Sequence, residues 1–181
     1  MTAIALPPRP RILVITLRRL GDVLLTTSLS RCIRRRFPGA TLHMLVFRSS
    51  VGILQGNPDL DSVLPVSERP STSESLALIR RLWRRYDLVV STQPGDRPTL
   101  YALIAGRWRA SFIPGPGETG AKWKRRAHHI GLTIEPGSHR VTQLMALGRA
   151  LGLDGRAEIV CPRQASAADF TAASAPDTLG R

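Results

Sequence analysis

Acidic residues are scarce in this chain of 181 residues, which has 13 Asp and Glu against 26 Lys and Arg. The formal net charge is therefore +13 at pH 7. A protein this basic attracts anions, so phosphorylated saccharide, nucleic acid and an acidic membrane face are the partners that the charge favours. A soluble protein from a GC-rich genome that prefers Arg to Lys would show the same excess, and this simpler explanation stays open.

Cysteine is also scarce, and neither the cysteines nor the histidines have the spacing of metal ligands. The two cysteines, Cys32 and Cys161, lie far apart and belong to neither a CxxC nor a CxxH pattern. We therefore expect reduced thiols, with no disulfide framework and no zinc site. The four histidines have no metal-ligand spacing either, so we expect no metal and no cofactor.

Long hydrophobic runs are missing as well. No apolar run approaches the ~20 residues that a membrane span needs. The first residues, MTAIALPPRPR, are broken by proline and lack the apolar core of a signal peptide. We expect a soluble, cytoplasmic protein whose contact with a membrane, if any, is peripheral and electrostatic.

Short apolar runs alternate with segments of helical spacing along most of the chain. The predicted strands cover residues 12–17, 41–47, 62–66, 88–91 and 110–113. The predicted helices cover residues 22–37, 51–56, 73–85, 99–105 and 141–151. Such alternation, with connections long enough for crossovers, is typical of an α/β fold whose parallel sheet is covered by helices on both faces.

The remaining segments suggest how the chain is organised. Residues 1–10 are predicted to be a flexible leader, and residues 11–161 a single domain. Within that domain, the glycine-rich and basic segment 114–138 is predicted to be a mobile loop. From residue 162 to 181 the sequence is small, polar and weakly patterned, as in a linker or a frayed tail.

The segment from Arg11 to Phe37 is the most informative, because an apolar run meets a Gly-Asp pair and a long helical pattern follows. Asp22 is the only acid among the first 58 residues. It follows a strand, and in open α/β sheets ligands bind beyond the carboxyl ends of strands. A carboxylate there can serve as a general base that takes a proton from a sugar hydroxyl. It can equally be a helix cap or a partner of the helix dipole.

The residues around Asp22 are candidates for substrate binding. Gly21 would allow a tight turn and bring the helix amides close to phosphate. Thr26, one turn further on, could orient the carboxylate or the acceptor hydroxyl. Arg18 and Arg19 could grip a phosphate or a sugar acid with paired donors, or could form a solvated pair.

Four further candidates follow the second and fourth predicted strands, on the ligand side of the sheet. They are Arg48, Gln93, Asp96 and Arg97. Each alone is as easily explained as a surface residue.

A dense cationic run surrounds Trp123. Its members are Lys122, Lys124, Arg125 and Arg126. The run could dock an anionic saccharide or a lipid surface, or could be a solvated face. One tryptophan is too little for a platform of stacked bases, and no nucleic-acid motif is present, so we expect no specific nucleic-acid binding.

Several motifs together resemble glycosyltransferase family 9, the ADP-heptose:lipopolysaccharide heptosyltransferases, and most of all its heptosyltransferase III-like branch. They are LGDV at 20–23, RRRFPGA at 34–40, NPDLDSV at 57–63, YDLVV at 86–90 and GSHRVTQLMALGRALGL at 137–153. The resemblance runs from about Arg11 to Leu153.

The resemblance implies a GT-B architecture, in which two Rossmann-like domains face each other across a cleft with no obligatory metal. This chain would be the N-terminal, acceptor-side domain, and the C-terminal donor-binding domain would be absent. The implied reaction is inverting transfer of heptose from ADP-L-glycero-D-manno-heptose to the anionic inner core of lipopolysaccharide. Asp22 would be the catalytic base.

The same resemblance implies that ADP-heptose is bound mostly by the second domain, so the chain alone is expected to be inactive. Two alternatives stay open. The chain could be a catalytically inactive fragment or an anion-binding module for phosphorylated saccharide or nucleic acid. It could also be a transferase of the same family that uses another nucleotide sugar.

Overall fold

The computed structural model describes residues 4–135 and 137–162. Six strands form one sheet in the order β3-β2-β1-β4-β5-β6, and each strand is parallel to its neighbours. The strands are β1 (Arg11–Thr16), β2 (Thr41–Phe47), β3 (Ser62–Val66), β4 (Tyr86–Ser91), β5 (Gly106–Ile113) and β6 (Ile130–Thr133).

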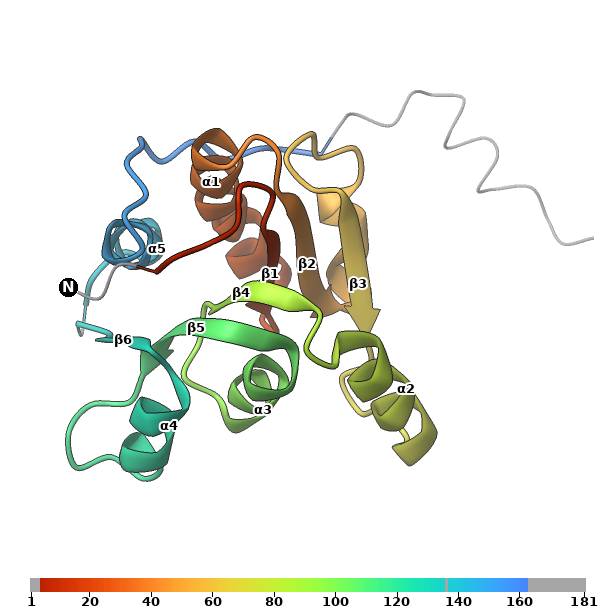
Figure 1. Cartoon of the computed structure of the whole chain (residues 1–181), viewed down its shortest axis with the longest axis vertical. Coiled ribbons are helices and arrows are strands. Elements are labelled where there is room, and N and C mark those ends of the chain that lie inside the picture. The colour runs from red at the N-terminus through yellow and green to blue at the C-terminus, as the bar shows by residue number, and fades with distance from the viewer. Residues whose placement is uncertain (1–3, 136, 163–181) are drawn as a thin grey trace, which may run out of the picture.

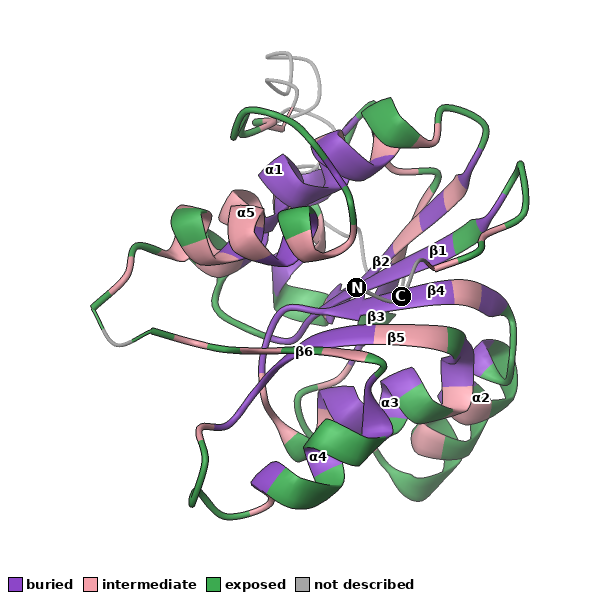
Figure 2. Ribbon diagram, turned by 60° about the vertical axis from the view of Figure 1, so that its left-hand side comes forward, coloured by how far each residue is buried: buried purple, intermediate pink, exposed green. Residues whose placement is uncertain are grey.

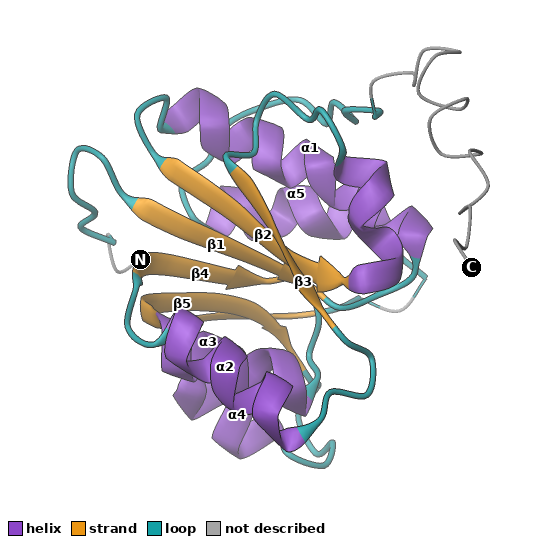
Figure 3. Ribbon diagram, turned by 90° about the vertical axis from the view of Figure 1, so that its right-hand side faces the viewer, coloured by secondary structure: helices purple, strands orange, loops and turns teal. Residues whose placement is uncertain are grey.

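The helices form a layer on each face of this sheet (Figure 1, Figure 3). They are α1 (Leu20–Arg36), the 3₁₀ helix η1 (Arg48–Leu54), α2 (Thr72–Leu82), α3 (Asp96–Ala105), α4 (Ala121–Ala127) and α5 (Arg140–Ala150). Helices α1 and α5 cover one face, and α2, α3 and α4 cover the other. The predicted parallel α/β fold, Rossmann-like as the family resemblance implied, is thereby confirmed. Among the described residues, no helix is long and apolar enough to cross a bilayer.

The central strands are buried because both of their faces are apolar. Ile12 and Val14 of β1 point into the core under α1 and α5, whereas Leu13 and Ile15 point into the core under α2 and α3. All four are fully buried, and the strands form the buried centre of Figure 2. A continuous apolar run is what a strand covered on both faces requires.

The start of α2 follows the predicted capping box. The Ser71 hydroxyl accepts a hydrogen bond from the Glu74 amide at 3.2 Å, and the Glu74 carboxylate accepts one from the Ser71 amide at 2.9 Å. Helix α1 begins differently: Arg19 precedes it in an extended conformation, and no side chain caps it. Asp22 lies in the first turn of α1 rather than at its N-cap, a position where a carboxylate also interacts favourably with the helix dipole.

The prediction of a mobile loop over residues 114–138 is wrong. This segment contains α4 and β6, and β6 extends the sheet by pairing with β5. Ala121 and Ala127, the first and last residues of α4, are buried, which explains how a helix so rich in cations can pack. In the short strand β6, Ile130 and Leu132 are partly buried and the other two residues are exposed, so its apolar signal in the sequence is weak.

The two ends of the chain differ in what can be described. Ile4 and Leu6 pack against the core under α1, and the Pro10 carbonyl accepts a hydrogen bond from the Thr41 amide at 2.9 Å. Residues 4–10 therefore lie against the domain rather than forming a loose leader. The predicted linker or tail falls, from residue 163 onward, outside the described residues.

Candidate functional site

The site lies where β1 and β4 meet at the centre of the sheet. After β1 the chain turns into α1 on one face, and after β4 it turns into α3 on the other. The loops that follow these two neighbouring strands therefore part, which is the place where open α/β sheets bind ligands. Asp22 is held over this point by the first turn of α1.

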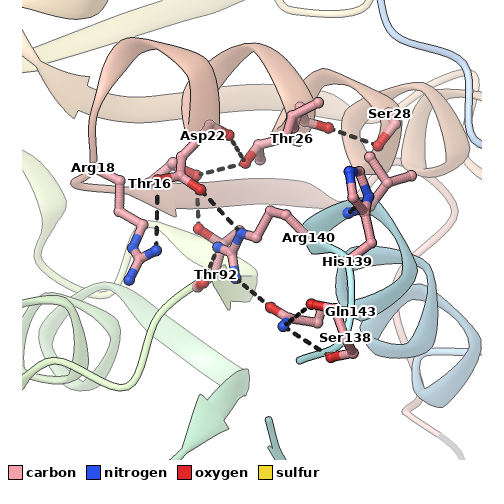
Figure 4. A network of polar contacts seen from close by, with 12 residues as sticks. Thr16, Arg18, Asp22, Thr26, Ser28, Thr92, Ser138, His139, Arg140 and Gln143 are labelled. Atoms are coloured by element: carbon pink, nitrogen blue, oxygen red, sulfur yellow. Dashed lines mark hydrogen bonds and ion pairs between the residues drawn. The ribbon is translucent and has the colours of Figure 1, made fainter. Parts of the chain in front are cut away.

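The Asp22 carboxylate lies between two arginines (Figure 4). Its Oδ1 is 3.4 Å from Nε of Arg140, and its Oδ2 is 3.5 Å from Nη1 of Arg18. The side chain of Asp22 is 24% exposed and that of Arg140 is 12% exposed. The carboxylate is thus fixed from the protein side by Arg140 and remains open to a ligand on the other side.

Arg140 is anchored by contacts beyond Asp22. Its Nη2 donates to the carbonyl of Thr92, and its Nη1 donates to Oε1 of Gln143 at 3.1 Å. Its guanidinium carbon lies 5.4 Å from the centre of the Phe112 ring. Burial lowers the pKa of Arg140, Arg18 lowers it further, and Asp22 raises it. The long contact between Nε and Asp22 is an ion pair without hydrogen-bond alignment, so Arg140 orients the carboxylate chiefly through charge.

Three buried threonines support the backbone beneath Asp22. The hydroxyls of Thr16 and Thr92 lie 3.0 Å apart, and the Thr16 hydroxyl donates to that of Thr26 at 3.5 Å. The Thr26 hydroxyl donates to the main-chain carbonyl of Asp22 at 2.8 Å. Thr26 therefore supports the first turn of α1. It was predicted to orient the Asp22 carboxylate or the acceptor hydroxyl, but its hydroxyl donates to the main chain instead.

An open cavity of about 890 Å³ lies beside Asp22. It is lined by Leu17, Arg18, Arg19, Leu20, Asp22, Phe47, Ser49, Ser50 and Glu68. The predicted pair of arginines thus meets Asp22 at one cavity, next to the ends of β2 and β3. Guanidinium groups, hydroxyls and a carboxylate around one recess suit a ligand that carries both hydroxyls and negative charge.

Gly21 does not make the tight turn that was predicted for it. It lies inside α1, and its φ is outside the left-handed region. A Cβ built at this position would meet nothing within 4 Å. Neither a turn nor a close approach of backbone explains the glycine.

The predicted residues after β2 and β4 are partly used for other contacts. Arg48 is exposed and forms a 3.5 Å ion pair with Glu74. Arg97 donates to the carbonyls of Ser67 and Glu68 at 2.7 and 2.9 Å, and so ties the end of β3 to α3. Neither Arg48 nor Arg97 lines the cavity beside Asp22, although Glu68, whose carbonyl Arg97 binds, does.

Gln93 is the member of this group closest to the switch point. Its side chain is buried, and its Oε1 has no hydrogen-bond partner among the described residues. Its main-chain carbonyl accepts from the hydroxyls of Ser91 and Ser111 at 3.1 and 3.3 Å. The loop after β4 is therefore firmly held next to the site.

The cationic run around Trp123 lies on α4, across the sheet from α1. Lys124 is buried and forms a 2.7 Å ion pair with Asp96, so both predicted ligand contacts are used within the protein. The remaining cations of the run are exposed; they are Lys122, Arg125 and Arg126. The structure does not bring this run to Asp22.

Arg140 is the site residue that the sequence reasoning missed. Nothing in its spacing distinguishes it from the other basic residues, since it lies 118 positions after Asp22 in the chain. Its only signal is its place in the segment GSHRVTQLMALGRALGL, which carries part of the family resemblance. In the described part of the chain, no group of three or more His, Cys, Asp or Glu side chains is placed to hold a metal.

Comparisons with known proteins show which proteins the chain resembles in sequence and in fold. No protein-family model matches the chain. Among curated proteins, the chain is 26% identical over 140 residues to lipopolysaccharide heptosyltransferase 3 of Escherichia coli, covering 74% of this chain and 40% of that protein. The chain thus spans less than half the length of the curated relatives it matches.

Two solved structures share the fold. A family 9 glycosyltransferase from Veillonella parvula superposes with a TM-score of 0.70 at 20% identity, over 84% of this chain and 44% of its own. Heptosyltransferase WaaC of E. coli, with ADP-2-deoxy-2-fluoro heptose, superposes with a TM-score of 0.63 at 18% identity, over 80% of this chain and 49% of its own. The chain is thus similar in sequence to a lipopolysaccharide heptosyltransferase and in fold to family 9 glycosyltransferases, in agreement with the resemblance found in the sequence.

Proposed function

We propose that this chain is the acceptor-side domain of an inverting heptosyltransferase that acts on the inner core of lipopolysaccharide. The observation that carries the proposal is the position of Asp22 at an 890 Å³ cavity that Arg18 and Arg19 also line. The similarity to lipopolysaccharide heptosyltransferase 3 supports the transferase class. The donor would be ADP-L-glycero-D-manno-heptose, held mostly by a donor-binding domain beyond this chain.

In the proposed reaction, an acceptor hydroxyl attacks the anomeric carbon of the heptose. The new C–O bond forms as the bond to the diphosphate breaks, and ADP leaves with the electron pair. The proton of the hydroxyl passes to the carboxylate of Asp22. One displacement from the face opposite the leaving group inverts the anomeric centre.

Arg140 and Arg18, the two arginines that contact Asp22, have different roles in this proposal. Arg140 is the positioning residue, because it is anchored to Thr92 and Gln143 and contacts Oδ1. Arg18 is more exposed, and it lines the cavity with Arg19. We assign Arg18 and Arg19 to the phosphate groups of the core saccharide, for which guanidinium groups are suited.

Binding of the acceptor tests the assignment on the chain as it stands. We would titrate it with a phosphorylated inner-core saccharide at constant ionic strength. The double variant Arg18→Gln/Arg19→Gln should weaken binding roughly tenfold or more, because charge-assisted hydrogen bonds to phosphate are lost. The matched control is Arg125→Gln/Arg126→Gln, which removes the same charge from α4.

The control also separates a specific site from general attraction. If both double variants weaken binding equally, charge alone holds the saccharide and the assignment of Arg18 and Arg19 is wrong. A dephosphorylated core that binds as well as the phosphorylated one would overturn it too.

An anion-binding module without transfer activity is the second candidate. Its support is the net charge of +13. Such a module would lose affinity steeply with salt and would be indifferent to substitution of Asp22. The heptosyltransferase proposal expects discrimination between core saccharides at a fixed salt concentration. Peripheral contact with the cytoplasmic membrane face is part of the first proposal and would follow from its lipid-borne acceptor.

A further inference from the structure

Five arginines line a second cavity at the amino ends of the strands, whereas Asp22 lies beyond their carboxyl ends. This cavity measures about 640 Å³ and is referred to below as the arginine cleft. It is lined by Arg11, Arg84, Arg85, Tyr86, Asp87, Leu103, Gly106, Arg107 and Arg109. Since β1 is 6 residues long, the amino and carboxyl ends of the strands are about 20 Å apart. The arginine cleft is therefore separate from the candidate active site.

The parallel sheet gathers these arginines from distant parts of the chain. Arg11 is the first residue of β1, and Arg107 is the second residue of β5. Strand β4 lies between these two strands, and Arg84 and Arg85 immediately precede it. The amino ends of the three strands lie together at one edge in Figure 3.

The charge in the arginine cleft is unbalanced. Asp87 is its one acid, and that carboxylate accepts a hydrogen bond from the Arg11 amide at 2.8 Å. Among the described residues, no carboxylate is within ion-pair distance of Arg84, Arg85 or Arg107. Like charges held this close repel one another, and a bound anion would relieve the repulsion.

The wall of the arginine cleft is fixed by backbone contacts. Arg109 donates through Nε to the Ala127 carbonyl at 2.6 Å and through Nη1 to the Gly106 carbonyl at 2.9 Å. Arg84 has a φ of 49°, which is uncommon for a residue with a side chain. Its amide donates to the Ile104 carbonyl at 2.8 Å, so the strained turn is held in place. Strain of this kind is retained where the surrounding structure determines it, and it is concentrated at functional sites.

We propose that the arginine cleft binds a soluble anion that carries two or more linked phosphate groups. Each guanidinium presents paired N–H donors that match the oxygens of a phosphate. The arginines of the cleft come from three separate segments of the chain, which favours a ligand with more than one phosphate. A recess of about 640 Å³ suits a compact soluble ligand. The proposal is independent of the heptosyltransferase function proposed above, because no residue is shared.

Calorimetric titration with inorganic tripolyphosphate at constant ionic strength tests the proposal. The test variant is Arg85→Gln/Arg107→Gln, since both side chains are exposed and form no hydrogen bond with the described residues. The control is again Arg125→Gln/Arg126→Gln, which removes the same charge elsewhere. Urea unfolding of each variant checks that the fold is intact, and Arg107→Gln alone replaces the double variant if it is not.

We expect saturable binding at one site for the unmodified protein and for the control. The affinity of the test variant should fall by roughly tenfold or more, because two guanidinium contacts are lost. Absence of saturable binding, or equal weakening in both variants, would overturn the proposal. Vesicles containing phosphatidylglycerol provide a further arm. If they bind through Arg85 and Arg107 while tripolyphosphate does not, the ligand is a lipid headgroup and the soluble anion is excluded.

Discussion

At the scale of single residues, the contact between Asp22 and Arg140 defines the candidate site. The two side chains come from α1 and α5, which pack against each other on one face of the sheet. Arg140 also binds the carbonyl of Thr92 after β4. One side chain therefore links two helices and a strand end around the proposed base.

Replacing Arg140 should destabilise the fold. Arg140→Gln removes an ion pair and a buried hydrogen bond to Thr92, and we expect a loss of about 1–3 kcal/mol in the free energy of unfolding. Urea denaturation measures it. The control is Arg149→Gln, which removes an exposed arginine from the last turn of the same helix. An equal loss in both variants would contradict the anchoring role of Arg140.

A buried histidine should make the stability depend on pH. Burial lowers the pKa of His128, whose Nδ1 lies 2.9 Å from the Lys124 carbonyl. The unfolded chain therefore takes up a proton at a higher pH than the folded one does. Stability should be complete above about pH 6.5 and should fall as the pH drops towards the lower folded pKa.

Unfolding by urea at about pH 7.5, 6.5 and 5.5 checks this dependence, and a titrating histidine adds at most about 1.4 kcal/mol per pH unit. His128→Asn should reduce the slope. Some slope should remain, because burial also lowers the pKa values of His43 and His129. An unchanged slope in the variant would show that His128 is not the source.

The residues of the site were only partly predictable. Asp22, Arg18 and Arg19 follow a strand, and that local pattern was enough to place them on one cavity. The partner of Asp22 depends on how α5 packs against α1, which no local spacing reveals. For the same reason the sequence alone does not reveal that Lys124 and Asp96, both predicted to contact a ligand, pair with each other.

At the scale of elements, the N-terminus of helix α2 is stabilised by the capping box of Ser71 and Glu74, which the sequence predicts. Ser71→Ala removes the hydroxyl that accepts from the Glu74 amide, and we expect a loss of about 1 kcal/mol in unfolding free energy. Ser75→Ala in the same helix is the control and should change the free energy of unfolding by only about a few tenths of a kcal/mol. Thermal and urea unfolding give both values. If the two variants are alike, the capping box contributes little.

The success of element prediction followed the strength of the local signal. Strands β2 and β3 were predicted with their observed bounds, because continuous apolar runs stand between clear turn residues. Helix α4 and strand β6 were missed within residues 114–138. Helix α4 is short and rich in cations, and β6 is held by pairing with β5, a contact between distant residues.

At the scale of the whole molecule, arginines line a cavity at each end of the parallel strands. Arg18 and Arg19 lie at the carboxyl edge with Asp22, and the arginine cleft lies at the amino edge. Composition predicted the attraction to anions but not this arrangement, which follows from the parallel order of the strands. The first edge carries the proposed transfer reaction, and the second carries an independent anion site.

Turnover of an Asp22 variant tests the central proposal most directly. In a form of the protein that includes the donor-binding domain, heptose transfer would be measured for Asp22→Asn beside the unmodified protein. Loss of the general base should lower turnover by about 10²–10⁴-fold, while the affinity for the acceptor changes little. Turnover close to that of the unmodified protein would contradict the assignment of Asp22 as the base.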